Sequence, residues 1–392
     1  MRILQVHTSY RQSGGEDTVV EAEAELLRSA GHAVHRHEAS NPSGRLATGA
    51  SLALSAWNPV AAAGVRTVVQ RFKPDVAHVH NTWFTLSPSV VEALDRLGVP
   101  VVATAHNYRT VCANAQLLRA GRPCEDCVGR VPWRAVPHRC YRSSMLASAA
   151  AATTIALQQR AGTWSTRVAV WLVLSRFAAV RLTAGTLPAD RTRVHPNFVA
   201  DPGPRAVKPS ASDLVLFVGR LAPEKGVEMA IEAWRQASPR GLKLVIAGEG
   251  PLRSQLARRL PPGVTLVGQL DPSEVADLMA RSRALLFPSR WYEGQPLVIL
   301  EAMASGLPIL ASDLGAMPEL VGSDGWGVCL PPTDIAAWAG ALSNLTDGAG
   351  LDAASRCGRA RYQFCHTPAH ALESLEAAYQ CARASADEEV PA

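Results

Sequence analysis

The stretch that decides the fold is Asp213–Gln236, DLVLFVGRLAPEKGVEMAIEAWRQ. It opens with the apolar run Asp213–Val218, which has the length of a buried strand, and closes with Val227–Gln236, which has the pattern of a helix. A loop, residues 219–226, with two glycines and two cations joins them. Because a buried strand, a short loop and a helix are the repeating unit of a parallel α/β sheet, we predict that fold class.

The same alternation extends over most of the chain. Further strands are expected in the second half at Lys243–Ala247, Val264–Val267, Ala284–Phe287 and Pro308–Ala311. The first half has strand patterns at Met1–His7, His32–His37, Asp75–His80, Pro100–His106 and Arg167–Leu174. A Pro- and Gly-containing linker separates the halves at 200–212. We therefore predict two doubly wound, Rossmann-like domains, 1–198 and 199–367, that face each other across a cleft. Residues 368–392 form a C-terminal helix, free to pack back toward the N-terminal domain, and an acidic tail.

Length and composition agree with two globular domains. The 392 residues are 47% apolar and 19% charged, which excludes a disordered, collagen-like or coiled-coil protein. The stretch that comes closest to a membrane span, Ala147–Leu157, is interrupted by Ser and Thr and is short of the roughly 20 residues that a membrane-spanning helix needs. The start, MRILQVH, lacks the apolar core of a signal peptide, so we expect a cytoplasmic protein. A peripheral position at the inner face of the membrane stays open.

Charge is distributed unevenly between the halves. Residues 1–200 carry 22 Arg and Lys against 12 Asp and Glu, a net charge of +10, whereas residues 201–392 carry 17 against 22, a net charge of −5. A basic first half suggests an anionic partner, such as a phosphorylated acceptor or a membrane surface, or else a solvated Arg-rich surface. No helix-turn-helix, zinc-finger or RNA-recognition signature is present, so nucleic acid is not an expected partner.

The loop after strand Asp213–Val218 has the residues of a diphosphate site. Gly219 permits close backbone approach, and Arg220 and Lys225 place two cations beside a helix N-terminus. Lys225 is one of only four lysines. The alternative is a basic turn that merely ends a strand.

A second motif, PSRWYEGQPLVILEAMA at 288–304, carries two carboxylates eight residues apart. Glu293 falls in a loop, and Glu301 lies in an apolar helix where burial without partners would be costly. Ligand hydroxyls are suitable partners, and the amides near Gly294–Leu297 would point toward an anion. The alternative, a capping glutamate plus a solvated one, does not explain the apolar helix.

These motifs resemble retaining glycosyltransferases of family 4, which have the GT-B fold. The resemblance rests on Glu293 and Glu301 as the Glu-x7-Glu signature, together with the Gly219–Gly226 loop. The Gly248–Pro251 turn, Ser312–Glu319, the glycine loop Ser9–Asp17, Thr104–Arg109 and His195–Asn197 also fit. Gln295 departs from the family, where Phe is frequent.

The resemblance implies roles for individual residues. Arg220 and Lys225 would stabilise the leaving diphosphate, and Glu293 would hold hydroxyls of the transferred sugar. His106 would reach the sugar or its transition state, although a histidine that ends a buried strand is also often a core residue. The implied donor-binding residues are Gly14, Gly15, Gly219, Glu249, Pro251, Gly294, Gln295, Pro296, Leu297 and, at the ribose, Glu301.

The implied reaction transfers a sugar from a nucleotide sugar, a UDP-sugar ahead of GDP-mannose, to an acceptor hydroxyl. No Asp-x-Asp pair is present to anchor a divalent ion, so no cofactor is expected for catalysis. A lipid-linked oligosaccharide, another anionic acceptor or a small molecule all remain open as acceptors. Two alternatives are a nucleotide-sugar epimerase on the same fold and a non-catalytic nucleotide-sugar-binding protein.

Four of the eight cysteines cluster in the irregular segment 107–141. Cys112, Cys124, Cys127 and Cys140 have the spacing Cys-x11-Cys-x2-Cys-x12-Cys. A Cys-x2-Cys pair with two outlying thiols is compatible with a structural zinc ion, and we expect one to order this segment near the acceptor side. Free thiols and disulfides are the alternatives.

Overall fold

The computed structural model describes residues 1–9, 14–42, 44–205, 207–322 and 324–388. The chain divides into two compact units. Unit 1 comprises Met1–Leu117, Cys124–Pro196 and Ala369–Ala392, and unit 2 comprises Leu118–Pro123 and Asn197–Pro368. Each unit is described by itself.

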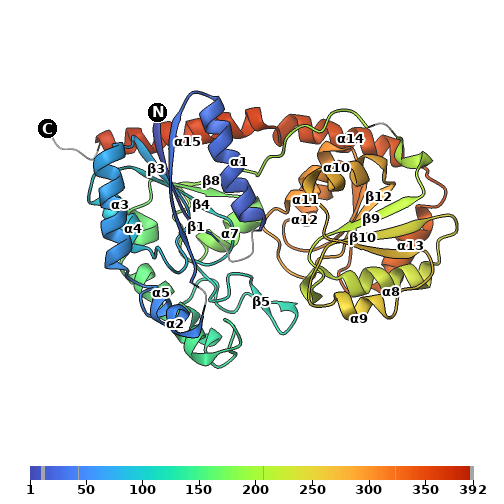
Figure 1. Ribbon diagram of the computed structural model, residues 1–392, viewed down its shortest axis with the longest axis horizontal. Coiled ribbons are helices and arrows are strands. Elements are labelled where there is room, and N and C mark those ends of the chain that lie inside the picture. Colours follow the sequence, from blue (N-terminus) through green and yellow to red (C-terminus); the bar gives the residue numbers. More distant parts are fainter. Residues whose placement is uncertain (10–13, 43, 206, 323, 389–392) are drawn as a thin grey trace. The chain divides into compact units, whose positions relative to one another are not determined.

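Unit 1 is built on a six-stranded sheet in which all pairs of neighbouring strands are parallel (Figure 1). The strand order is β2-β1-β3-β4-β7-β8. The strands are β1 (Arg2–Ser9), β2 (Ala33–Ser40), β3 (Val76–Asn81), β4 (Val101–Ala105), β7 (Val170–Val173) and β8 (Thr192–Val194). Because β1 pairs with β2 on one side and β3 on the other, the chain changes direction across the sheet at β1.

Helices cover this sheet and bury its apolar strands. Ile3, Val76 and Leu172 of the sheet share a core with Leu27 of α1 (Gly15–Ser29) and with several residues of α15 (Pro368–Glu388). The C-terminal helix therefore packs on the sheet of unit 1. The other helices are α2 (Arg45–Ala53), α3 (Pro59–Phe72), α4 (Ser89–Asp95), α5 (Met145–Arg160), α6 (Thr163–Thr166) and α7 (Arg176–Thr183).

Unit 2 repeats the plan with a second parallel six-stranded sheet, ordered β11-β10-β9-β12-β13-β14. Its strands are β9 (Leu214–Val218), β10 (Lys243–Ala247), β11 (Val264–Gly268), β12 (Ala284–Phe287), β13 (Ile309–Ser312) and β14 (Gly327–Leu330). Helices α8 (Val227–Ala237) and α13 (Ile335–Asn344) lie on one face, and α10 (Pro272–Arg281), α11 (Leu297–Ala304) and α14 (Leu351–Cys365) on the other (Figure 1). Two short helices, α9 (Arg253–Ala257) and α12 (Met317–Val321), complete the unit.

The predicted α/β class with two doubly wound sheets is confirmed. Most of the expected strands start or end within two residues of the observed ones, because the apolar runs that form buried strands are local signals. The segment 107–141 is not wholly irregular: it contains a two-stranded hairpin, β5 (Leu118–Arg119) and β6 (Arg122–Pro123), and a 3₁₀ helix, η1 (Pro132–Ala135).

Candidate functional site

The site of unit 2 lies where the strand order reverses. Strand β9 has β10 on one side and β12 on the other, so the loops that follow β9 and β12 leave the sheet as neighbours. Such a switch point, at the carboxyl ends of parallel strands, is where α/β sheets bind ligands. Both charged sequence motifs fall on these two loops.

The two loops are in direct contact. The Arg290 amide donates to the Glu224 carbonyl at 2.8 Å, and a Cβ added at Gly226 would lie 1.9 Å from the Pro288 carbonyl oxygen. Gly226 also has a φ of 71°, a left-handed conformation that glycine adopts without strain. Only glycine at 226 allows this approach, and it holds the Lys225 loop against the Glu293 loop.

Lys225 and Glu293 form an ion pair at this junction. The Lys225 ammonium donates to Glu293 Oε1 at 2.7 Å, and the Ser289 hydroxyl donates to the same oxygen at 2.8 Å. The side chains of Lys225 and Glu293 are 21% and 8% exposed, so the pair is mostly withdrawn from water. The Lys225 Nζ also lies 5.4 Å from the centre of the Trp291 ring. Ser289 and Trp291 were missed as site residues, although both stand inside the 288–304 motif.

Arg220 lies on the same loop and is more exposed. Its guanidinium pairs with Glu224, and 55% of its side chain is accessible. Just beside it, the turn Gly248–Pro251 packs on the Arg220 loop, since the Leu221 amide donates to the Glu249 carbonyl at 2.8 Å. A Cβ at Gly248 would lie 2.0 Å from the Gly219 carbonyl oxygen. The structure thus brings Gly219, Arg220, Glu249 and Pro251 together, with the Glu249 carboxylate paired to Arg253.

Gln295 is buried and engaged within unit 2. Asn197 donates its backbone amide to Gln295 Oε1, and its side-chain amide donates to the Gln295 carbonyl at 3.0 Å. Gln295 therefore ties the loop before α11 to the start of unit 2. It precedes Pro296, the N-cap of α11, whose first residue is Leu297.

Glu301 lies in the middle of α11 between buried apolar residues. Burial raises the pKa of its carboxyl group above the ordinary glutamate value. Within the described parts of the chain, the carboxylate of Glu301 has no ion-pair partner. A carboxylate that is partly removed from water without a partner in the protein is available to accept hydrogen bonds from a ligand.

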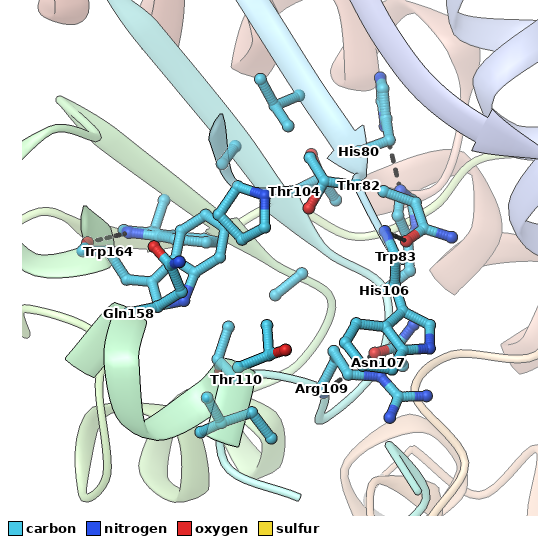
Figure 2. A pocket seen from close by; sticks show the side chains of 18 residues that line it. His80, Thr82, Trp83, Thr104, His106, Asn107, Arg109, Thr110, Gln158 and Trp164 are labelled. Atoms are coloured by element: carbon cyan, nitrogen blue, oxygen red, sulfur yellow. Dashed lines mark hydrogen bonds between the residues drawn. The ribbon is translucent and has the colours of Figure 1, made fainter. Parts of the chain in front are cut away.

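Unit 1 has a pocket at the carboxyl ends of β3 and β4 (Figure 2). Its volume is about 70 Å³. In Figure 2, His106, Asn107 and Arg109 line one side, and Gln158 and Trp164 the other. The Arg109 guanidinium lies 4.5 Å from the centre of the Trp83 ring. The pocket is mostly apolar and aromatic, with a few polar groups, which suits a small organic ligand or one ring of a larger one.

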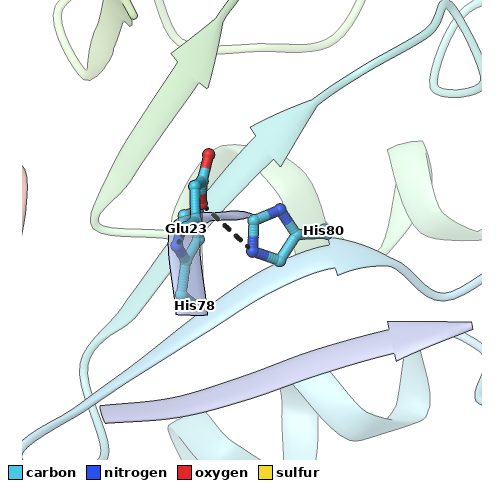
Figure 3. Close-up of side chains that lie close together, drawn as sticks. All are labelled: Glu23, His78 and His80. Carbon is cyan, nitrogen blue, oxygen red and sulfur yellow. Dashed lines mark ion pairs between the residues drawn. The ribbon is translucent and has the colours of Figure 1, made fainter. Parts of the chain in front are cut away.

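His106 contacts a buried polar network, of which Figure 3 shows Glu23, His78 and His80. His80 Nδ1 is 3.0 Å from His106 Nε2, and His80 Nε2 lies 3.6 Å from the Glu23 carboxylate, which is also 3.6 Å from His78. His195 lies 3.8 Å from Glu23. Burial, and then the charges of His7 and His195, lower the pKa of His106 to about 3, so its ring is neutral.

Glu23 was missed at the sequence level. It lies on the buried side of α1 and is 1% exposed, but a single glutamate in a helix with other acidic residues gives no sign of burial. A signal for its partners exists: His78 and His80 are two apart in a strand, so their side chains share one face.

The glycine loop of unit 1 is described only in part, because residues 10–13 lie outside the described residues. Gly14 and Gly15 stand at the start of α1, where the Gly14 amide donates to Asp17 at 2.9 Å. Asp17 also contacts His7 at 2.8 Å.

The clustered cysteines are neighbours, and all eight cysteines are free thiols. Burial, followed by the nearby Cys112, Cys124 and Cys140, raises the pKa of the Cys127 thiol to about 11. Among the described residues, the group of His, Cys, Asp and Glu whose ligand atoms all lie within 4.8 Å of one another is Glu23, His78 and His80. The cysteine sulfurs are not that close together.

Two family models match this chain. The model of Glycosyltransferase Family 4 matches residues 13–201, and that of Glycosyl transferases group 1 matches residues 212–347. The chain belongs to glycosyltransferase family 4, a GT-B family. Within the described residues, no helix has the length and apolar character needed to cross a membrane.

Individual relatives agree with this family. A glycogen synthase of Mycobacterium tuberculosis is 39% identical over 156 residues, 38% of this chain and 37% of that protein. The chain thus spans less than two fifths of the length of the curated relatives it matches first. Sucrose-phosphate synthase from Thermosynechococcus elongatus has the same fold, with a TM-score of 0.71 at 19% identity, over 97% of this chain and 98% of that one. Anabaena HepE, solved with UDP-glucose, has a TM-score of 0.67 at 17% identity, over 96% of this chain and 100% of that one.

Proposed function

We propose that this chain transfers a sugar from a nucleotide sugar to an acceptor hydroxyl with retention of anomeric configuration. Membership of glycosyltransferase family 4 supports the reaction class. Anabaena HepE, which shares the fold, binds UDP-glucose, and this favours a UDP-sugar over GDP-mannose as the donor.

The observation that carries the proposal is the Lys225–Glu293–Ser289 cluster at the switch point of unit 2. Lys225 and Arg220 are the cations that would meet the donor diphosphate, and Glu293 the carboxylate that would hold sugar hydroxyls. Glu301, with its unpartnered carboxylate, would accept hydrogen bonds from the ribose. Gly219, Glu249, Pro251, Gly294 and the start of α11 at Pro296 and Leu297 would border the donor, with Gly14 and Gly15 on the phosphate side.

In the proposed reaction, the bond between the anomeric carbon and the diphosphate oxygen breaks, and the acceptor oxygen bonds to the same face of that carbon. The acceptor proton passes to the departing phosphate oxygen. Negative charge therefore develops on the diphosphate, where preorganised cations lower the barrier. Arg220 and Lys225 supply the compensating positive charge from the protein, so we propose that catalysis needs no metal ion.

Unit 1 would supply the acceptor side. The pocket beside His106 is partly apolar, and the neutral ring of His106 is able to accept a hydrogen bond from an acceptor hydroxyl. Both a small acceptor and the sugar end of a lipid-linked or other anionic acceptor fit this description.

A panel of nucleotide sugars tests the proposal. We expect one donor to raise the melting temperature and to be hydrolysed slowly without acceptor, as followed by mass spectrometry, and chelator to leave this hydrolysis unchanged. Lys225→Ala should abolish the hydrolysis. Conversion of the donor to an isomeric nucleotide sugar would indicate an epimerase instead, and binding without any turnover would indicate a non-catalytic protein.

We also propose that Cys112, Cys124, Cys127 and Cys140 hold a structural zinc ion. The four thiols neighbour one another, and zinc would draw their sulfurs together and deprotonate them. Elemental analysis of protein purified without chelator should find one zinc per chain, and Cys124→Ser should lose it while Cys357→Ser, at an exposed cysteine elsewhere, keeps it. Absence of zinc with four titratable thiols would contradict the proposal.

A further inference from the structure

Unit 1 displays a group of large apolar side chains on its surface between residues 131 and 146. Val131 is 39% exposed, Trp133 50%, Met145 48% and Leu146 85%. Single exposed apolar residues are ordinary on protein surfaces, but a tryptophan and three large aliphatic side chains within sixteen residues are not.

The local fold explains why these apolar side chains are exposed. In η1, Pro132 and Ala135 are buried, while Trp133 and Arg134 between them point outward, because residues three apart share one face of a 3₁₀ helix. The turn is held against α5: the Cys140 amide donates to the Ala135 carbonyl at 3.0 Å, and the Tyr141 amide donates to Ser148 of α5 at 2.9 Å. Met145 and Leu146 form the first turn of the same α5.

Four exposed arginines belong to the same stretch of the sequence. Arg130, Arg134, Arg139 and Arg142 are exposed, and none of them forms an ion pair within the described residues. Of the two carboxylates just before them, Glu125 is paired with Arg181, and Asp126 is half-buried and has interactions of its own. From Cys127 to Ala189 the sequence has eight arginines and no aspartate or glutamate. The cations of this surface are therefore not neutralised by their own neighbourhood.

We propose that this surface, residues Arg130–Leu146, docks on an anionic lipid bilayer. Tryptophan and aliphatic side chains enter the boundary between headgroups and acyl chains, and unpaired arginines bind lipid phosphates. The combination distinguishes a membrane from nucleic acid, which would use the arginines but gain little from Met145 and Leu146.

The position of the surface has a consequence that rests on the proposed function. Later turns of α5 line the pocket beside His106 through Thr154, Ile155 and Gln158. Docking of the first turn of α5 would bring this pocket near the headgroups, so the acceptor would be lipid-linked.

Co-sedimentation with vesicles tests the docking surface and needs neither donor nor acceptor. We expect the full chain to bind vesicles of phosphatidylcholine mixed with phosphatidylglycerol, to leave vesicles of phosphatidylcholine alone, and to dissociate as salt is raised. Each exposed arginine near a bilayer contributes a factor of about five in partitioning, so Arg134→Gln with Arg139→Gln should weaken binding roughly 25-fold. Trp133→Ser with Leu146→Ser should weaken it at least tenfold.

Matched controls lie on α3 of the same unit. Arg66→Gln with Arg71→Gln removes the same charge, and Val60→Ser changes a side chain that is 76% exposed. Both should bind vesicles like the wild type, and all variants should melt at the wild-type temperature because the altered residues are exposed. Equal losses of vesicle binding in the α3 variants would show that net charge, and not this surface, determines binding. If vesicle binding survives Trp133→Ser with Leu146→Ser, and duplex DNA binds equally well, the surface recognises polyanions in general and the membrane proposal is wrong. An active enzyme that never sediments with anionic vesicles would overturn the docking surface and leave the proposed function intact.

Discussion

Replacing Lys225 by methionine tests the central assignment in the donor site. Methionine keeps the length of the side chain and removes the charge, so Glu293 keeps only the Ser289 hydroxyl as a donor to Oε1. Breaking a fully buried ion pair costs about 3–5 kcal/mol, and an exposed pair contributes about 0–1 kcal/mol. Since the Lys225 side chain is 21% exposed and that of Glu293 8%, we expect the variant to lose about 1–3 kcal/mol of unfolding free energy.

The effect on turnover should be larger than the effect on stability. A preorganised group that meets developing charge in a water-poor site is worth about 3–4 kcal/mol, so kcat/KM for donor hydrolysis should fall about 100- to 1000-fold. Turnover is measured with saturating and limiting donor, and stability by denaturant unfolding of the same preparations.

The chain contains a matched control for this experiment. Lys243 pairs with Asp213 at 2.8 Å, nearly the distance of the Lys225–Glu293 pair, but the two side chains are 68% and 55% exposed. Lys243→Met should therefore cost at most about 1 kcal/mol and leave turnover unchanged. Turnover by Lys225→Met within threefold of the wild type would refute the diphosphate role. Equal destabilisation by the two methionine variants would refute the argument from burial.

The binding roles of the two glutamates, the protonation of Glu301, the packing at Gly248 and the stereochemistry of the product can each be tested. Glu301→Gln should weaken nucleoside diphosphate binding about 10- to 100-fold in calorimetry, because a charged hydrogen-bond acceptor is lost. Glu293→Gln should leave this binding nearly unchanged and reduce turnover of the nucleotide sugar. Similar affinities of the two variants for the nucleoside diphosphate would contradict the assignment. Burial raises the pKa of Glu301 in the folded state above its unfolded value, so folding takes up a proton at a pH between the two pKa values. The stability contributed by this proton is complete below the unfolded pKa and disappears as the pH rises through the folded pKa. Glu301→Gln should therefore be more stable than the wild type in urea melts at pH 7 but not at pH 3. Gly248→Ala should cost more than about 2 kcal/mol because its Cβ would meet the Gly219 carbonyl, and Gly340→Ala in α13, with nothing within 4 Å, should be neutral or stabilising. The product should keep the donor's anomeric configuration by NMR, and an inverted product would exclude the proposed retaining mechanism.

Much of the donor site could be anticipated from local sequence. Arg220, Lys225 and Glu293 follow apolar runs of strand length, and the carboxyl ends of parallel strands carry ligands. Glu301 stood out because the residues around it are apolar, and the structure shows it half-buried among them, with the pKa of its carboxyl group raised by burial. Gln295 was anticipated at the donor, but its contacts with Asn197 depend on a residue 98 positions away and have no local signature.

The sequence by itself determined the two parallel sheets, since strand and helix periodicities are properties of neighbouring residues. It also located the two cationic and acidic loops. The tertiary structure alone decided which side chains meet: Lys225 with Glu293 across 68 positions, and His80 with His106 behind the pocket. It also decided that Glu23 is buried and that Trp133 is exposed. Burial depends on which elements pack together, and this packing joins residues that are far apart along the chain.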